Sequence, residues 1–210
     1  MIVAIDGPAG AGKSTVARLL AQRLRFRYLD TGAMYRALTW LAMRKELPLD
    51  RGDDLAALAQ EHAVEFDSRG RVFIGGTDVT SSIRKPEIDR LVPVVARHPQ
   101  VREVMRERQR ALGSEADAVI EGRDIGTVVA PHAEVKVYLV ADPTVRAKRR
   151  MADRPGIGAD ALATDLRLRD EKDAHNMRPS PDAVEIDTTD STAEEVVDRI
   201  EALVLARRAA

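Results

Sequence analysis

The stretch that decides the fold is Gly7-Pro8-Ala9-Gly10-Ala11-Gly12-Lys13-Ser14, which matches the pattern G-x-x-x-x-G-K-[ST]. A short apolar run, Ile2-Val3-Ala4-Ile5, precedes it and predicts a buried parallel strand with no polar face. After the loop, apolar residues recur at helical spacing from Lys13 to about Leu24. The order strand, glycine-rich loop, helix is the context in which this pattern indicates a phosphate-binding loop.

The residue types in the loop suit a nucleoside triphosphate. Glycines let the backbone wrap an anion, and the amide N–H groups and the helix N-terminus stabilise its charge. We expect Lys13 to reach the β- and γ-phosphates and the Ser14 hydroxyl to ligate Mg²⁺, the predicted cofactor. The predicted ATP-binding residues are Gly7, Pro8, Ala9, Gly10, Ala11, Gly12, Lys13, Ser14 and Thr15.

The length and composition exclude several classes of protein. The 210 residues suit one α/β domain with a small insertion. The formal net charge of −1 gives no overall basic field for a nucleic acid. The absence of cysteine excludes disulfides, Cys-ligated zinc and thiol nucleophiles. The first apolar run is too short for a signal peptide or a membrane span, so we expect a cytoplasmic protein with no membrane or nucleic-acid partner.

Strands and helices alternate along most of the chain. Besides the first strand, we predict short apolar strands over 27–29, 118–120, 135–140 and 183–187. The predicted helices cover 13–24, a stretch from 31, 52–63, 86–96, 99–112, 143–151, 159–174 and the C-terminal residues. Thr31 is the predicted N-cap of the second helix. Thr192 and Glu195 have the spacing of a capping box for the last helix.

One region interrupts this alternation. Residues 64–67 and 71–74 have alternating polarity around a glycine-containing turn, which predicts an antiparallel hairpin with a third strand at 77–79. The whole pattern predicts an α/β fold, a doubly wound five-stranded parallel sheet of the P-loop NTPase type, with an inserted α+β subdomain. We place the core at 1–60 and 113–210, the insert at about 61–112 and a short lid at about 150–161.

The phosphate loop alone does not choose among kinases, motor ATPases and GTPase switches. The guanine-reading pattern Asn-Lys-x-Asp is absent from the sequence. Transfer between two polyanions needs many cations, and arginines stand at or beside predicted strand ends, where ligands bind in open α/β sheets: Arg36, Arg123, Arg146, Arg149, Arg150 and Arg154. These residues favour a small-molecule phosphotransferase. A nucleotide-dependent switch or binding module is the alternative from a different class.

Several motifs resemble those of the bacterial cytidylate (CMP) kinases, a group of nucleoside monophosphate kinases. The resemblance spans nearly the whole chain and rests on I-D-G-P-A-G-A-G-K-S-T at 5–15, L-D-T-G-A-M-Y-R at 29–36, E-G-R-D-I-G-T-V-V at 121–129, R-D-E-K-D at 169–173 and A-V-E-I-D-T-T at 183–189. The insert also resembles the monophosphate-binding subdomain of that family. The resemblance implies transfer of the γ-phosphoryl of MgATP to CMP or dCMP, giving ADP and CDP or dCDP.

The resemblance also implies roles for individual residues. Arg36, Arg102 and Arg123 match arginines that hold the acceptor phosphate or flank the pyrimidine, and guanidinium forks suit a phosphate dianion. Asp124 would accept a hydrogen bond from the exocyclic amine of cytosine, which uracil lacks. The remaining matches are Thr31 and Tyr35 in the acceptor site, Arg169 and Asp173 on the ribose hydroxyls, and Arg146, Arg149 and Arg150 as closing-lid arginines. The catalytic residues implied are Lys13, Arg123, Arg149 and Arg150.

The sequence departs from the family at two positions. Pro93 stands where a serine near the base is usual, and it offers neither a hydroxyl nor an N–H. Asn176 stands where an arginine is common, and Arg178 follows two residues later. Kinases for UMP or shikimate are the enzymatic alternatives. We expect a monomer whose partners are its small-molecule substrates.

Overall fold

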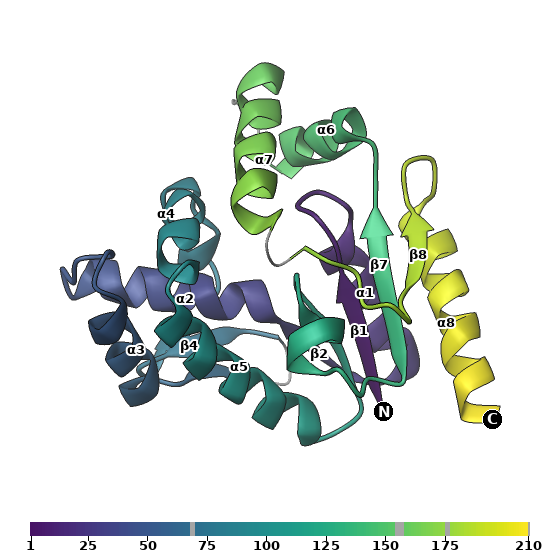
Figure 1. Cartoon of the computed structure of the whole chain (residues 1–210), viewed down its shortest axis with the longest axis horizontal. Coiled ribbons are helices and arrows are strands. Elements are labelled where there is room, and N and C mark those ends of the chain that lie inside the picture. The colour runs from purple at the N-terminus through teal and green to yellow at the C-terminus, as the bar shows by residue number, and fades with distance from the viewer. Residues whose placement is uncertain (68–69, 154–157, 175–176, 210) are drawn as a thin grey trace. The chain divides into compact units, whose positions relative to one another are not determined.

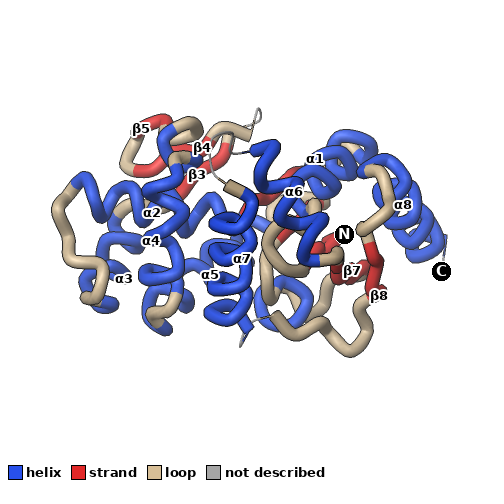
Figure 2. The backbone as a smooth tube through the Cα atoms, turned by 90° about the horizontal axis from the view of Figure 1, so that it is seen from above, coloured by secondary structure: helices blue, strands red, loops and turns tan. Residues whose placement is uncertain are grey.

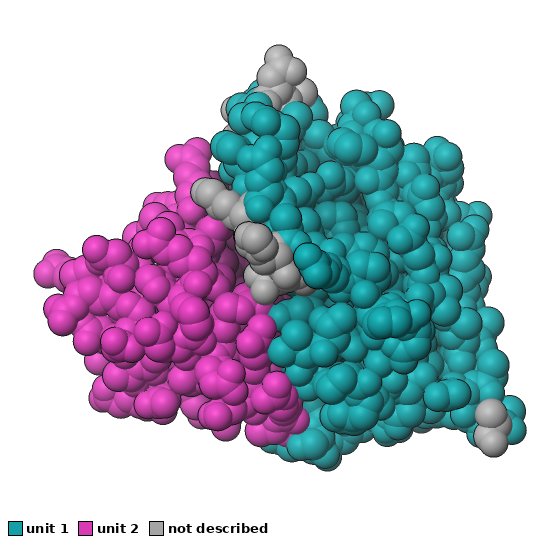
Figure 3. Space-filling view, in the orientation of Figure 1, with its two compact units in different colours: residues 1–29, 113–210 teal, residues 30–112 magenta. Residues whose placement is uncertain are grey.

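The computed structural model describes residues 1–67, 70–153, 158–174 and 177–209. The chain divides into two units (Figure 3). Unit 1 consists of Met1–Leu29 and Gly113–Ala210, and unit 2 of Asp30–Leu112. The predicted lid, at about 150–161, and Asn176 lie partly or wholly outside the described residues. Within the described ranges, no helix is long and apolar enough to cross a membrane.

The sheet of unit 1 has the predicted five parallel strands, in the order β2-β6-β1-β7-β8. They are β1 (Ile2–Asp6), β2 (Arg27–Asp30), β6 (Ala118–Glu121), β7 (Val135–Val140) and β8 (Val184–Asp187). Strand β1 pairs with β6 from Ile2↔Ala118 and with β7 from Val3↔Val135. A strand that is bonded on both edges and covered on its faces is buried, and residues 3–6 of β1 are. This explains why the run before the loop is apolar up to Ile5.

Helices α1 (Lys13–Leu24) and α8 (Ala193–Ala209) lie side by side on one face of this sheet (Figures 1 and 2). Val16 and Leu20 of α1 and Val197 and Ile200 of α8 join the strand residues in one apolar cluster. Unit 1 also contains η2 (Ile125–Val129), a wide helical turn of π type, and the helices α6 (Pro143–Asp153) and α7 (Ala159–Asp173). The sequence pattern did not predict η2.

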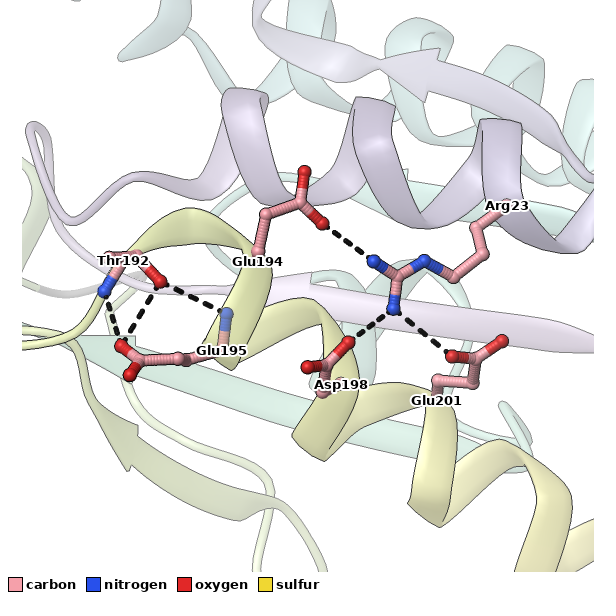
Figure 4. Close-up of polar contacts among 6 residues, drawn as sticks. All are labelled: Arg23, Thr192, Glu194, Glu195, Asp198 and Glu201. Carbon is pink, nitrogen blue, oxygen red and sulfur yellow. Dashed lines mark hydrogen bonds and ion pairs between the residues drawn. The ribbon is translucent and has the colours of Figure 1, made fainter.

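Polar contacts join α1 to α8 and fix where α8 begins (Figure 4). Arg23 of α1 donates to Glu194 at 2.6 Å, to Glu201 at 3.1 Å and to Asp198, all on α8. The predicted capping box is confirmed: Glu195 N donates to Thr192 Oγ1 at 3.2 Å, and Thr192 N donates to the Glu195 carboxylate at 2.8 Å.

Unit 2 contains the predicted three-stranded antiparallel sheet, β3-β4-β5, with one helix, α2, packed against β3 and β4 and two others, α3 and α4, packed against α2. Its elements are α2 (Thr31–Arg44), α3 (Gly52–Glu61), β3 (Val64–Phe66), β4 (Val72–Ile74), β5 (Thr77–Asp78), the 3₁₀ turn η1 (Ser82–Arg84), α4 (Pro86–Ala96) and α5 (Pro99–Ser114). Met34 and Leu38 of α2 are fully buried, as are Ile74 and Ile88 of β4 and α4. Pro93 lies inside α4.

The predicted cap of α2 is wrong by one residue. Thr31 is the first helical residue, and Asp30 is the N-cap, whose carboxylate accepts a hydrogen bond from Ala33 N at 2.9 Å. Aspartate and threonine are both good N-caps, so the choice depends on where the strand ends. Strand β2 continues to Asp30, which places the aspartate at the capping position.

Candidate active site

The phosphate loop leaves β1 at Gly7 and enters α1 at Lys13. Gly7 has a φ of 143°, and a Cβ atom there would lie 2.2 Å from the backbone oxygen of Leu139 on β7. A side chain at this position would therefore collide with the neighbouring strand, and glycine is required by space as well as by conformation. Lys13 Nζ donates to Pro8 O at 2.7 Å, so its ammonium group lies back across the loop.

A cavity of about 400 Å³ opens beside the loop. Its walls come from the loop and the start of α1, from α6, and from the β8–α8 connection with the first turn of α8: Gly10, Ala11, Gly12, Lys13, Ser14, Thr15, Val16, Arg149, Arg150, Ala152, Thr188, Ser191, Thr192, Ala193 and Val196. The structure thus brings together three of the predicted catalytic residues, Lys13, Arg149 and Arg150. Three cationic side chains around a glycine-rich loop form a site for a polyanion.

Two arginines of α6 bond to the backbone around this cavity. Arg146 is buried and donates to Ala9 O of the loop at 3.1 Å and to Asp170 of α7 at 2.7 Å. It therefore links the loop to α7. Arg149 donates to the hydroxyl of Thr188 at 3.0 Å and to its carbonyl oxygen at 2.6 Å. The Thr188 hydroxyl also lies 3.1 Å from Ala11 O, so this threonine connects Arg149 to the loop.

Glu121 ends β6 beside the loop, and only 4% of it is exposed. Its carboxylate accepts hydrogen bonds from Ser14 Oγ at 2.9 Å and from the hydroxyl of Tyr28. Because Ser14 donates its proton to Glu121, the lone pairs of its oxygen remain available to a cation. A hard oxygen donor next to a phosphate site fits Mg²⁺, which takes few protein ligands when phosphates supply the others. The residues present therefore fit this metal.

Asp6, the last residue of β1, anchors the segment that carries Arg123 and Asp124. It is 5% exposed, and its two carboxylate oxygens accept from Ile125 N at 2.9 Å and Gly126 N at 2.8 Å. Burial raises the pKa of Asp6 to about 6, and the negative charge of Asp124 adds to this, against the lowering effect of the two N–H donors and Lys13. Arg123 Nη1 donates to Gly7 O at 2.5 Å, so this arginine contacts the start of the loop.

Unit 2 carries the other predicted acceptor residues. Thr31, Tyr35 and Arg36 lie in the first turns of α2, and Arg102 lies on α5. Arg36 pairs with the capping residue Asp30 at 2.8 Å. A Cβ atom at position 32 would lie 3.2 Å from the Arg36 guanidinium, so Gly32 leaves room for it. In the motif Asp30-Thr31-Gly32, the aspartate thus caps the start of α2 and pairs with Arg36, and the glycine leaves room for the Arg36 guanidinium.

Two predicted ribose contacts lie on α7 at positions 169 and 173, and their side chains are outside the described residues. The sequence reasoning missed Asp6, Glu121 and Thr188 as site residues. Each of the three ends or directly follows a strand of the parallel sheet. A polar residue at the end of a predicted strand could have marked all three as candidates, because ligands bind at that edge of such sheets.

The fold and the site together define a P-loop phosphotransferase. The chain has the same fold as shikimate kinase from Bacteroides thetaiotaomicron, with a TM-score of 0.51, 18% identity, and coverage of 97% of this chain and 98% of the other. More specifically, the model of the family "Cytidylate kinase" matches residues 3–206, and the chain belongs to that family.

Curated relatives agree with this family. The cytidylate kinase of Geobacillus sp. (strain WCH70) is 46% identical over 213 residues, covering 96% of this chain and 95% of the relative. The cytidylate kinase of Bacillus subtilis (strain 168) is 43% identical over 209 residues, covering 94% and 93%. The chain is therefore a nucleoside monophosphate kinase with cytidylate kinase function, and the family implies ATP and CMP as its substrates.

Proposed function

We propose that the cavity at the phosphate loop holds ATP during transfer of its γ-phosphoryl group to CMP or dCMP. The observation that carries this proposal is the arrangement of Lys13, Arg149 and Arg150 around the glycine-rich loop in one cavity. The loop N–H groups and these cations would stabilise the charge of the triphosphate and of the loose transition state. Ala193 and Val196 offer an apolar wall for the base.

Ser14 would hold Mg²⁺ at this site, and Glu121 would orient the Ser14 hydroxyl. Bound Mg²⁺ would supply positive charge that neutralises the phosphates. The contact of 2.9 Å between Ser14 and the buried carboxylate supports this assignment. Titration of Mg²⁺ against a fixed ATP concentration tests it: Ser14→Ala should raise the Mg²⁺ concentration needed for half-maximal rate. An unchanged requirement would remove Ser14 from the metal site.

For the acceptor, we propose that Arg36, Arg102 and Arg123 bind the phosphate of CMP and that Asp124 reads the cytosine amine. Thr31, Tyr35, Arg169 and Asp173 are the further proposed contacts. Arg123→Ala should lower kcat/KM for CMP by at least about a hundredfold, the scale of losing a transition-state charge donor. A loss under about threefold would refute the role of Arg123.

Specificity for cytosine is tested separately by binding. Isothermal titration of CMP and of UMP into the protein should show tighter binding of CMP, because only cytosine carries the amine that Asp124 would bind. Asp124→Asn should narrow this difference, since an amide can donate to the uracil oxygen as well. Equal binding of CMP and UMP by the unchanged protein would refute the role of Asp124. A dCMP titration decides whether the 2′-hydroxyl matters.

The remaining proposals concern the whole chain. We propose that residues about 61–112 are the inserted CMP-binding subdomain, that residues about 150–161 close as a lid, and that the protein works as a monomer in the cytoplasm. Light scattering at assay concentration tests the monomer, and cell fractionation tests the location.

A further inference from the structure

Asp6 is a buried carboxylate that the proposed phosphoryl transfer does not use. Its contacts go to consecutive backbone N–H groups, those of Ile125 and Gly126, at 2.9 and 2.8 Å. These amides begin the turn η2 immediately after Arg123 and Asp124. The carboxylate comes from the end of β1, which leads into the phosphate loop one residue later. Asp6 therefore ties the start of the loop to the segment after β6.

The two contacts favour the ionised form of the side chain. Each oxygen accepts from a different N–H, and both oxygens of a carboxylate are strong acceptors. Protonation turns one oxygen into a hydroxyl, which is a weaker acceptor, and so weakens a buried hydrogen bond, which is costly away from water. An asparagine loses this acceptor altogether, because its amide nitrogen is a donor. Asp6 thus holds the segment through two strong acceptors that only a carboxylate provides.

Charged groups from several elements surround Asp6. Asp124 raises the pKa of Asp6 and Lys13 of α1 lowers it. Burial raises the pKa of Tyr138 on β7, and the charge of Asp6 adds to this rise against the effect of Arg123. The stem of Lys136 on β7 packs near Gly126, while its ammonium group bonds to Asp182. Burial raises the pKa of Asp6 by more than the N–H donors and Lys13 lower it, so the pKa is about 6.

We propose that Asp6 is a positioning residue for the reaction: its ionised carboxylate holds the segment Arg123–Gly126 beside the start of the phosphate loop. This inference rests on the proposed function, because it assigns Asp6 an effect through Arg123 and Asp124. Arg123 itself reaches Gly7 O at 2.5 Å, so a second contact joins the same two segments. Without the carboxylate, the segment that carries Arg123 is no longer held at the start of η2, and only the contact between Arg123 and Gly7 O remains of the two.

The first test needs no variant and no substrate. In the ¹⁵N-labelled protein, the amide proton resonances of Ile125 and Gly126 should shift together with pH, with a midpoint at about 6. The amide of Ile2, which donates to Glu134 at 2.7 Å at the opposite end of β1, is the internal control. Burial raises the pKa of Glu134, but the Ile2 hydrogen bond and nearby positive charges outweigh it, so the Ile2 amide should titrate at lower pH. Ile125 and Gly126 amides that do not shift together at any pH at which the protein stays folded would overturn the proposal.

The second test is kinetic and uses matched variants at pH 7.5. Asp6→Asn should lower kcat/KM for CMP about tenfold, the scale of leaving a buried donor unpaired, with a smaller effect on KM for ATP. Glu134→Gln removes the carboxylate that accepts from Ile2 N at the other end of β1. Its kcat/KM for CMP should stay within about twofold of that of the unchanged protein. Arg123→Ala is measured in parallel. If Arg123→Ala loses activity and Asp6→Asn does not, the positioning role is wrong and the proposed function stands. If Arg123→Ala keeps its activity, the proposed function fails at that residue.

Discussion

The buried carboxylate of Asp6 predicts that one contribution to stability has an unusual dependence on pH. The pKa of this group rises from 3.8 to about 6 on folding, mainly because of burial. Between these values the folded state binds more protons than the unfolded state, so protonation of Asp6 stabilises the fold at low pH. This contribution is lost as the pH rises through about 6. Most carboxylates in hydrogen bonds behave in the opposite way.

The magnitude follows from the two pKa values. Between pH 4.5 and pH 7, the linkage relation gives a loss of about 2 kcal/mol from Asp6 alone. Asp6→Asn removes the titrating group. The variant also changes the free energy of unfolding by an amount that does not depend on pH, and this amount cancels when two pH values are compared. The free energy of unfolding of the unchanged protein, minus that of the variant, should therefore fall by about 2 kcal/mol from pH 4.5 to pH 7. Taking the difference cancels the other titrating groups.

Urea unfolding followed by circular dichroism at the two pH values measures this difference. Glu134→Gln serves as the control. The free energy of unfolding of the unchanged protein, minus that of Glu134→Gln, should rise from pH 4.5 to pH 7, because the pKa of Glu134 lies below its usual value. A difference for Asp6→Asn that is independent of pH, or that rises toward pH 7, would refute the reasoning about burial.

Three further predictions concern other parts of unit 1. Gly7→Ala places a Cβ atom 2.2 Å from Leu139 O and should destabilise the protein by about 2 kcal/mol or more, seen as a lower Tm; an unchanged Tm would contradict the fit of the loop against β7. Lys13→Ala should lower kcat by about a hundredfold or more with an unchanged circular dichroism spectrum, and full activity would remove Lys13 from the reaction. Arg23→Gln removes the exposed ion pairs with α8, so the fall in Tm that it causes should be smaller in about 1 M NaCl than in about 50 mM NaCl, because salt screens surface charges. A fall in Tm that salt does not change would mean that packing, rather than charge, holds these helices together.

Local patterns predicted most of the fold because they depend on neighbours in the sequence. The apolar run before Gly7, the helical spacing after Lys13 and the capping box at Thr192 all need only a few adjacent residues, and the structure has each of them. The cap of α2 was misplaced for the same local reason, since strand and helix signals meet at Asp30 and Thr31.

The site was harder to predict because it depends on which strands are neighbours. Strand β1 pairs with β6 and β7, which lie more than a hundred residues away, rather than with β2. That pairing places Glu121 beside Ser14 and Asp6 beside the turn η2. Periodicity identifies a strand but not its neighbours, so these contacts could not be predicted from the sequence.

The most direct test of the central claim compares acceptors in one steady-state assay with MgATP. CMP and dCMP, UMP, AMP and shikimate are each offered as the acceptor, and ADP formation is followed. We predict that cytidine monophosphates are phosphorylated and that kcat/KM for UMP is lower by about tenfold or more, the scale expected when a hydrogen-bonding partner is missing. Equal rates with UMP, or transfer to shikimate without transfer to CMP, would contradict it.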